Sequence, residues 1–318
     1  MALHGSVRVD QARGMTSRTA VLAHAARQAR HAPSILNTQP WQWRIGRHTA
    51  ELRPDPARLL AHVDPDRHLA LLSCGAALHH AVVTIRAQGW DLAVERGTDP
   101  LARITLAGTA APEFTELAGA IAHRYTDRRA FGAQPPSGET IAELRRVVLP
   151  HGFDTHLVRR DEVPLLAAAT ARAAGDAAHR PGHTAEVAQW ASGGSSAGGV
   201  RPVPMRALHG PATGDGDVGA RYLILHSTLG GDWLRAGEAL SALLLTATVR
   251  GVACSPMSEL VEAPWPRGLL GTLIGGAVHP YLVIRIGYPV IGEPPPAAAR
   301  RPEAETTSYL FTGASAHL

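Results

Sequence analysis

Two stretches of the chain resemble each other. GAALHHAVVTIRAQG (residues 75–89) and GEALSALLLTATVRG (residues 237–251) share both end glycines and the pairs Ala77/Ala239, Leu78/Leu240 and Thr84/Thr246. Their offset is 237 − 75 = 162, close to half of the 318 residues. Both have the apolar density of a buried helix, and a glycine is typical just beyond a helix end. We therefore predict two equivalent core helices, each followed by its glycine.

A candidate strand with proline at its second position follows each predicted helix. The two stretches are DPLARITLAG (residues 99–108) and HPYLVIRIGY (residues 279–288), and both have the apolar and β-branched content of sheet strands. The repeated order predicts a duplicated α+β chain with halves at about residues 1–115 and 116–318. The alternative is that two Ala/Leu-rich helices look alike by chance in an Ala-rich protein.

The second half contains an insertion at about residues 191–220 that is rich in Gly, Pro and Ser. Loops of this length are usually functional or mobile. GSSAG and GDGDVG within it match the letters of a hydrolase elbow and a dinucleotide loop. Neither has the strand that its chemistry needs in front of it, so we assign neither function.

Composition excludes several classes of protein. All 31 basic residues are Arg, the net charge is only +4, and no basic stripe interleaved with aromatics points to nucleic acid. Two cysteines give no disulfide framework, and the 17 histidines show no metal spacing. No stretch approaches the ~20 uninterrupted apolar residues of a membrane span. We expect a cytoplasmic protein without metal, membrane or nucleic acid partners.

The stretch HAPSILNTQPWQWRI (residues 31–45) has the side chains of a site for a flat polar ring. Pro33, Ser34, Asn37 and Gln39 come just before two tryptophans. Amide and hydroxyl groups can pair with the edge of such a ring. Ser34 and Asn37 can equally cap a helix or stabilise a turn. For Trp41 and Trp43 we predict core packing rather than ligand contact.

A second polar stretch, HRYTDRRAF (residues 123–131), opens the other half. Arg124, Thr126 and Arg128 alternate, so in an extended chain they point the same way. Two guanidinium groups and a hydroxyl suit a phosphate. A solvated charge run compensated by Asp127 is the alternative.

Together these features resemble the FMN-dependent nitroreductase superfamily. They are APS-x-x-N-x-QPW, R-x-S/T-x-R, an apolar helix closed by glycine, GYP near the end and a late RRP. The chain is most similar to the Acg subfamily, in which two nitroreductase-like halves are fused, from about Ser17 onward and least in residues 191–220. The resemblance implies an α+β nitroreductase fold with mixed central sheets flanked by helices. It also implies a monomer whose duplicated chain mimics the usual homodimer.

The resemblance further implies one composite FMN site per chain, because each half keeps a different part of the motif. Arg124 and Thr126 would hold the phosphate and ribityl chain, and Arg128 would stabilise charge near flavin N1 and O2. Either Arg300 or Arg301 would also meet the phosphate. The ring edge and face would meet two further groups, Pro33, Ser34, Asn37 and Gln39, and Met257, Ser258 and Glu259.

Two functions follow from the resemblance. The first is NAD(P)H-dependent ping-pong reduction of a small nitroaromatic or quinone through flavin N5, with no dedicated catalytic acid or base. The alternative is an FMN-sequestering protein in which residues 191–220 close as a lid over the flavin and no substrate is turned over. A dehydrogenase or iodotyrosine-deiodinase-like activity on the same fold is neither supported nor excluded.

Overall fold

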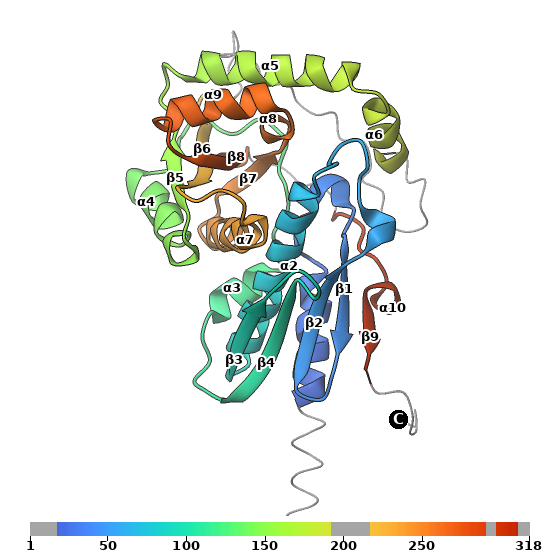
Figure 1. The fold of residues 1–318 in the computed structure, drawn as a ribbon. Helices are drawn as coiled ribbons and strands as arrows, with labels where there is room; N and C mark the ends of the chain where they lie inside the picture. Colours follow the sequence, from blue (N-terminus) through green and yellow to red (C-terminus); the bar gives the residue numbers. More distant parts are fainter. Residues whose placement is uncertain (1–17, 192–216, 291–296, 311–318) are drawn as a thin grey trace, which may run out of the picture.

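Two β-sheets lie on opposite sides of a pair of long buried helices in the computed structural model of the chain (Figure 1). The structure describes residues 18–191, 217–290 and 297–310. Most of the predicted lid at residues 191–220 lies outside this part. The predicted α+β class, with sheets and flanking helices, is confirmed.

The first sheet has five strands in the order β3-β4-β2-β1-β9. Its strands are β1 (Trp41–Ile45), β2 (Thr49–Pro54), β3 (Trp90–Arg96), β4 (Ala102–Thr109) and β9 (Thr307–Tyr309). All neighbours are antiparallel except β1 and β9, which run parallel, so this sheet is mixed as predicted. Trp41 and Trp43 are fully buried, which confirms their predicted place in the core.

The second sheet has four strands in the order β5-β6-β8-β7. They are β5 (Asp154–Leu157), β6 (Arg221–Ser227), β7 (Ala253–Met257) and β8 (His279–Gly287). Every pair is antiparallel, so the expectation of a mixed sheet is wrong here. The strand predicted at residues 279–288 is confirmed as β8, whereas β3 and β7, which follow the two long helices, were not predicted.

Both sheets have the same internal topology. In each, the first strand pairs with the second, the second with the fourth, and the fourth with the third, always antiparallel. A long helix joins the second strand to the third in both cases: α2 (His68–Ala87) in the first half and α7 (Trp233–Val249) in the second. The predicted core helices are therefore confirmed, and Gly89 and Gly251 adopt positive φ just beyond them, as expected of helix-terminating glycines.

α2 and α7 pack against each other through glycines at equivalent positions. A methyl group on Gly75 would lie 1.8 Å from the carbonyl oxygen of Leu234, and one on Gly237 would lie 1.9 Å from that of Leu72. The backbones approach this closely only because neither glycine has a side chain. α2 has the length and hydropathy of a membrane-spanning helix, but 83% of its most apolar window is buried inside the protein.

The other α-helices between β4 and β8 in the chain are α3 (Thr115–Ala120), α4 (Gly138–Arg146), α5 (Val163–His179), α6 (His183–Ala191), α8 (Glu259–Glu262) and α9 (Pro264–Ile274). α4, α5, α8 and α9 lie around the second sheet, whereas α3 lies beside α2 and α7 (Figure 1). α6 reaches across to the first half, where the Glu186 carboxylate accepts the backbone N–H groups of Ala61, His62 and Val63 at 2.7–2.9 Å.

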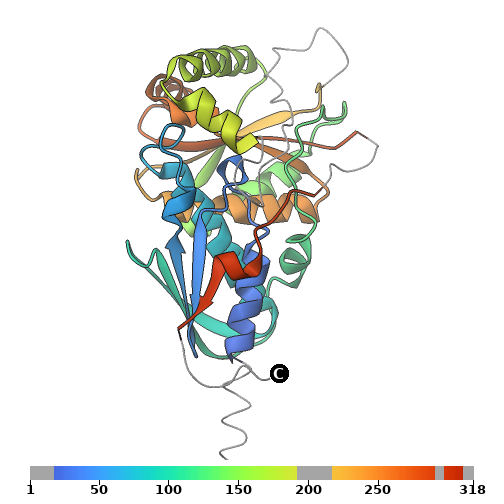
Figure 2. The same cartoon turned by 90° about the vertical axis from the view of Figure 1, so that its right-hand side faces the viewer.

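The last described segment returns to the first half. Figure 2 shows α10 (Glu303–Thr306) and β9, in red, against the first sheet and the helix formed by residues 18–29. β9 pairs with β1 although it follows the second half in the chain. A strand that follows the second half in the chain therefore completes the sheet of the first half.

Candidate functional site

A cavity of about 1100 Å³, including the space open at its mouth, lies between the two halves. Its walls come from the turn before β1, from the first turns of α2, from the segment that precedes α4 and from β7, α8 and β8. The lining residues are Pro33, Ser34, Ile35, Leu36, Leu69, Leu72, Ser73, Thr126, Arg128, Asp217, Leu240, Ser255, Pro256, Met257, Ser258, Glu259, Leu282 and Arg285. Apolar walls with a few polar groups are typical of a site for a flat organic ligand.

The turn on the first wall is strained. It contains the short 3-10 helix η1 (Ile35–Asn37), and Leu36, Asn37 and Gln39 have φ values of 44°, 54° and 51°. Each such non-glycine residue costs about 1–3 kcal/mol, and such strain tends to occur at functional sites. The Ser34 hydroxyl accepts the N–H of Gln39 at 3.0 Å, so Ser34 both lines the cavity and closes the turn.

The second wall is formed by an extended segment and by β7. Thr126 forms a parallel bridge with Cys254, and the N–H of Asp127 donates to the Cys254 carbonyl at 2.9 Å. This pairing places Thr126 and Arg128 on the cavity beside Met257. Burial lowers the pKa of Arg128, and the negative charge of Glu259 opposes that shift.

A group of cations lies where the turn meets the end of the chain. Arg124 and Arg300 both donate to the carbonyl oxygen of His31, at 3.4 and 3.1 Å. Burial lowers the pKa of Arg124 to about 9, with a further contribution from Arg300, and it lowers that of Arg300 to about 10, with a contribution from Arg30. Within the described part of the chain, no carboxylate forms an ion pair with Arg30, Arg124 or Arg300. We call these three residues the arginine cluster.

Several buried polar atoms around the arginine cluster have no hydrogen-bond partner in the part of the chain that the structure describes. They are the Nε atoms of Arg30 and Arg124 and both ring nitrogens of His80, which lies on α2. Burial, and then the charge of Arg124, holds the pKa of His80 well below its usual value, so this imidazole is neutral. The cluster therefore has unused donors and uncompensated positive charge, which is the chemistry that an anion would satisfy.

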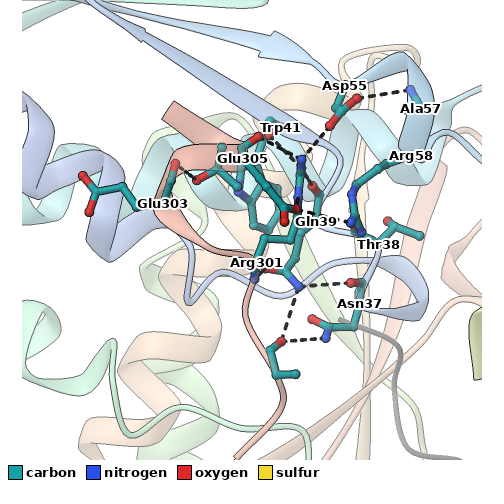
Figure 3. A network of polar contacts seen from close by, with 12 residues as sticks. Asn37, Thr38, Gln39, Trp41, Asp55, Ala57, Arg58, Arg301, Glu303 and Glu305 are labelled. Atoms are coloured by element: carbon teal, nitrogen blue, oxygen red, sulfur yellow. Dashed lines mark hydrogen bonds and ion pairs between the residues drawn. The ribbon is translucent and has the colours of Figure 1, made fainter. Parts of the chain in front are cut away.

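Arg301 has other partners than Arg300, and Figure 3 shows the polar network around Arg301. Its guanidinium pairs with Asp55 at 2.9 Å and donates to the carbonyl oxygens of Gln39, Trp41 and Glu305. Its backbone N–H donates to the Gln39 side chain at 2.9 Å. Arg301 and Gln39 thus tie the returning chain end to the first half.

Comparison with known proteins identifies the family. No family model matches the chain. Over 305 residues it is 33% identical to the Mycobacterium tuberculosis protein with the provisional name NAD(P)H nitroreductase Rv3131, covering 87% of this chain and 88% of the relative. The chain belongs to the nitroreductase family. The resemblance predicted from the sequence motifs is thereby confirmed.

The chain is also similar to two further proteins. The M. tuberculosis protein acg, also provisionally named an NAD(P)H nitroreductase, is 32% identical over 312 residues, covering 89% of this chain and 94% of its own. A solved nitroreductase with bound FMN from Desulfitobacterium hafniense is 15% identical and aligns with 62% of this chain and 98% of its own, with a TM-score of 0.43.

This nitroreductase-family chain brings together most of the residues expected at its site. Seven line the cavity: Pro33, Ser34, Thr126, Arg128, Met257, Ser258 and Glu259. Arg124 and Arg300 belong to the arginine cluster. Asn37 contacts the arginine cluster from the strained turn: its amide N–H donates to the Ala299 carbonyl at 2.9 Å, and its amide oxygen accepts from Arg300 at 3.2 Å. Gln39 and Arg301 are not among the cavity-lining residues.

Sequence reasoning missed several polar residues of the site. Arg30 belongs to the arginine cluster, His80 lies beside that cluster, and Ser73 lies on the cavity. Asp217 and Arg285 form an ion pair on the far wall of the cavity with oxygen–nitrogen distances of 2.8 and 3.0 Å. Arg285 carried a usable signal, since a charged residue within the apolar run of residues 279–288 is unusual for a buried strand. The others had no signal in a single sequence.

Proposed function

We propose that this chain is an FMN-binding oxidoreductase that uses NAD(P)H to reduce small acceptors such as nitroaromatics or quinones. The observation that carries the proposal is the arginine cluster, which has no carboxylate partner among the described residues and lies close to the strained turn on the cavity wall. A phosphate next to a cavity of this size and polarity fits a phosphorylated flat ring. Family membership supports the same class of chemistry.

The residues present fit FMN. Arg124 and Arg300, with Arg30 behind them, would hold the phosphate, because guanidinium groups pair well with phosphate oxygens. Thr126 would meet the ribityl chain. Pro33 and Ser34 would lie along the ring edge, and the backbone of residues 257–259 would face the ring. Arg128 would stand near the pyrimidine edge.

Bound FMN would supply the redox chemistry, taking a hydride from NAD(P)H and giving it to the acceptor in turn. The protein contributes orientation and charge. Arg128 is held on the cavity wall before any reaction, and a preorganised cation stabilises negative charge that develops next to it. The apolar residues Leu69, Leu72 and Met257 exclude water from the same space.

We also propose that the two halves arose by duplication and that the chain works as a monomer with one FMN. The identical sheet topologies and the reciprocal pairs Gly75–Leu234 and Gly237–Leu72 support this. In an isologous interface, a contact between two positions is always matched by the reverse contact. The site draws on both halves unequally, with the turn from the first half and Arg124, Thr126 and Arg128 from the second.

The test is to purify the protein and record its visible spectrum with and without added FMN. We expect the spectrum of bound oxidised FMN and its rapid bleaching by NADPH or NADH under anaerobic conditions, followed by recovery when a quinone is added. FMN that stays oxidised at full occupancy would support the sequestering alternative. Failure to bind FMN even after reconstitution would contradict both.

A further inference from the structure

The described lining of the cavity contains four ionisable side chains. Two of them, Asp217 and Arg285, neutralise each other through a two-point ion pair at 2.8 and 3.0 Å. Asp217 also accepts the backbone N–H of Phe131 at 2.6 Å. The other two are Arg128 and Glu259, and neither has an ion-pair partner within the described part of the chain.

Glu259 begins α8 immediately after β7, which places it on the cavity wall beside Met257. The charged groups that act on it are Arg128 on the facing segment and Glu262 one turn further along α8. Glu262 is itself engaged by Ser258 at 2.9 Å, Arg180 at 3.2 Å and His183 at 3.6 Å. Glu259 is therefore the one acid on the described cavity lining that is not tied up in an ion pair.

The environment of Glu259 favours a carboxyl group that exchanges its proton near neutral pH. Burial raises its pKa to about 7, its own backbone N–H opposes the shift, the charge of Glu262 adds to it, and Arg128 opposes it. A donor is most effective when its pKa is close to the working pH. Within the described residues, the Glu259 side chain forms no hydrogen bond or ion pair with another element, which argues against the structural alternative of a carboxylate that holds α8 in place.

We propose that Glu259 is a catalytic residue that donates a proton to the acceptor during its reduction. The inference rests on the proposed function. A quinone in the cavity takes a hydride, with its two electrons, from the reduced flavin. The negative charge that this leaves on a quinone oxygen is neutralised when the O–H bond of Glu259 breaks and a new O–H bond forms on the quinone. The resulting carboxylate faces Arg128 and regains a proton from water.

The test follows the acceptor half-reaction alone. The FMN-loaded protein is reduced anaerobically and mixed with benzoquinone over a range of pH. We expect the rate of flavin reoxidation to fall as pH rises through about 7 in the unsubstituted protein. Glu259→Gln should be about 10²-fold slower at low pH and independent of pH, because a general acid typically contributes at least this factor. Glu259→Asp should restore the pH dependence.

A second readout does not depend on turnover. Infrared spectra of the protein, with and without FMN, should show the carbonyl band of a protonated carboxyl that titrates near pH 7 and is missing in Glu259→Gln. Glu262→Gln is the control, and it should keep both this band and the pH dependence of the rate. Because the charge of Glu262 raises the pKa of Glu259, the titration of the band and of the rate should both shift to lower pH.

A rate for Glu259→Gln equal to that of the unsubstituted protein, or a Glu259 that is ionised throughout, would overturn the proposal while the proposed function stands. Loss of FMN binding or of quinone reduction by the unsubstituted protein would overturn both.

Discussion

His79 and Ser241 lie 162 residues apart and are hydrogen-bonded through Nδ1 and Oγ at 2.9 Å. This separation equals the offset of the sequence repeat, so each residue contacts its own equivalent. Contacts between equivalent positions occur on the two-fold axis of a symmetric interface. The pair therefore marks an approximate axis between α2 and α7, in agreement with the glycine contacts one turn earlier, and it supports our proposal of duplication.

The close approach of α2 and α7 predicts that Gly75→Ala destabilises the protein by about 3 kcal/mol or more. Overpacking usually costs about 1–3 kcal/mol, and here the obstructing atom is a backbone oxygen that cannot rotate away. Urea unfolding measures the change. Gly175→Ala on α5 is the control, because nothing lies within 4 Å of its new methyl group, and we expect it to be more stable by about 0.5–1 kcal/mol. Equal stabilities for both variants would contradict the packing described.

Replacing Arg124 should change stability and FMN affinity in opposite directions. In the flavin-free protein, Arg124→Met removes a buried cation that has no ion-pair partner among the described residues, so we expect the free energy of unfolding to rise by roughly 2 kcal/mol. FMN affinity should fall at least about thirtyfold, since loss of a buried charged partner costs 2 kcal/mol or more. Arg86→Met, which removes a surface arginine paired with Asp91 and Glu113, should change neither quantity. Fluorescence titration and urea unfolding measure the two effects. Arg124→Met that is destabilised and binds FMN normally would refute the anion site.

Substitutions of the neighbours Arg300 and Arg301 should have different effects in fluorescence titration with FMN and in urea unfolding. Arg301→Met leaves Asp55 buried without its partner, so we expect a loss of stability of about 3 kcal/mol and little change in FMN affinity of the folded protein. Arg300→Met should weaken FMN binding instead. Asp55→Asn serves as the matched control and should reproduce the loss of stability. An FMN affinity that depends on Arg301 as strongly as on Arg300 would contradict this division.

Asp64 predicts a particular dependence of stability on pH. Its carboxylate accepts the N–H groups of Leu69 and Ala70 at the start of α2, yet burial raises its pKa from 3.8 to about 6. The folded state then binds more protons than the unfolded state between about pH 4 and 6, so the contribution of Asp64 to stability falls as pH rises through this window. The fall is about 3 kcal/mol at most.

Asp64→Asn removes this titration. The variant should lose about 1 kcal/mol at pH about 4, because the amide accepts only one of the two N–H bonds well. It should gain stability relative to the original protein as pH approaches 7. Urea unfolding across this pH range measures the difference in free energy of unfolding between the two proteins. The contributions of other titrating groups are the same in both and cancel in this difference. A difference that does not change with pH would contradict the shifted pKa.

Much of the fold could be predicted because the two core helices carry a strong signal. An apolar run of that length, followed by glycine, has few alternatives, and both helices form where expected. β3 was missed although its apolar residues Trp90, Leu92 and Val94 alternate with exposed ones, and the strand lies largely exposed at a sheet edge. β7 was missed because it is only five residues long and includes a proline, which is rare inside a strand.

The motifs of the candidate site could be predicted from the sequence, but the directions and contacts of the individual side chains could not. The sequence indicated that Ser34 and Arg128 serve one ligand, and both line the same cavity. It could not separate Arg300 from Arg301, because the direction of adjacent side chains depends on a backbone path that only the folded chain defines. Arg30 and His80 were beyond reach for a related reason: their roles arise from neighbours distant in sequence.

The pairing of β9 with β1 has a consequence for how the protein is made. On the ribosome, β1 and the rest of the first sheet emerge long before Thr307–Tyr309 are synthesised. Until then the edge of β1 presents unpaired backbone groups, which are open to other chains. The N-terminal half thus passes through much of translation with an incomplete sheet, and the strand that completes it is made only after the whole second sheet. We therefore expect a nascent chain halted before residue 297 to aggregate more readily than a chain that includes β9.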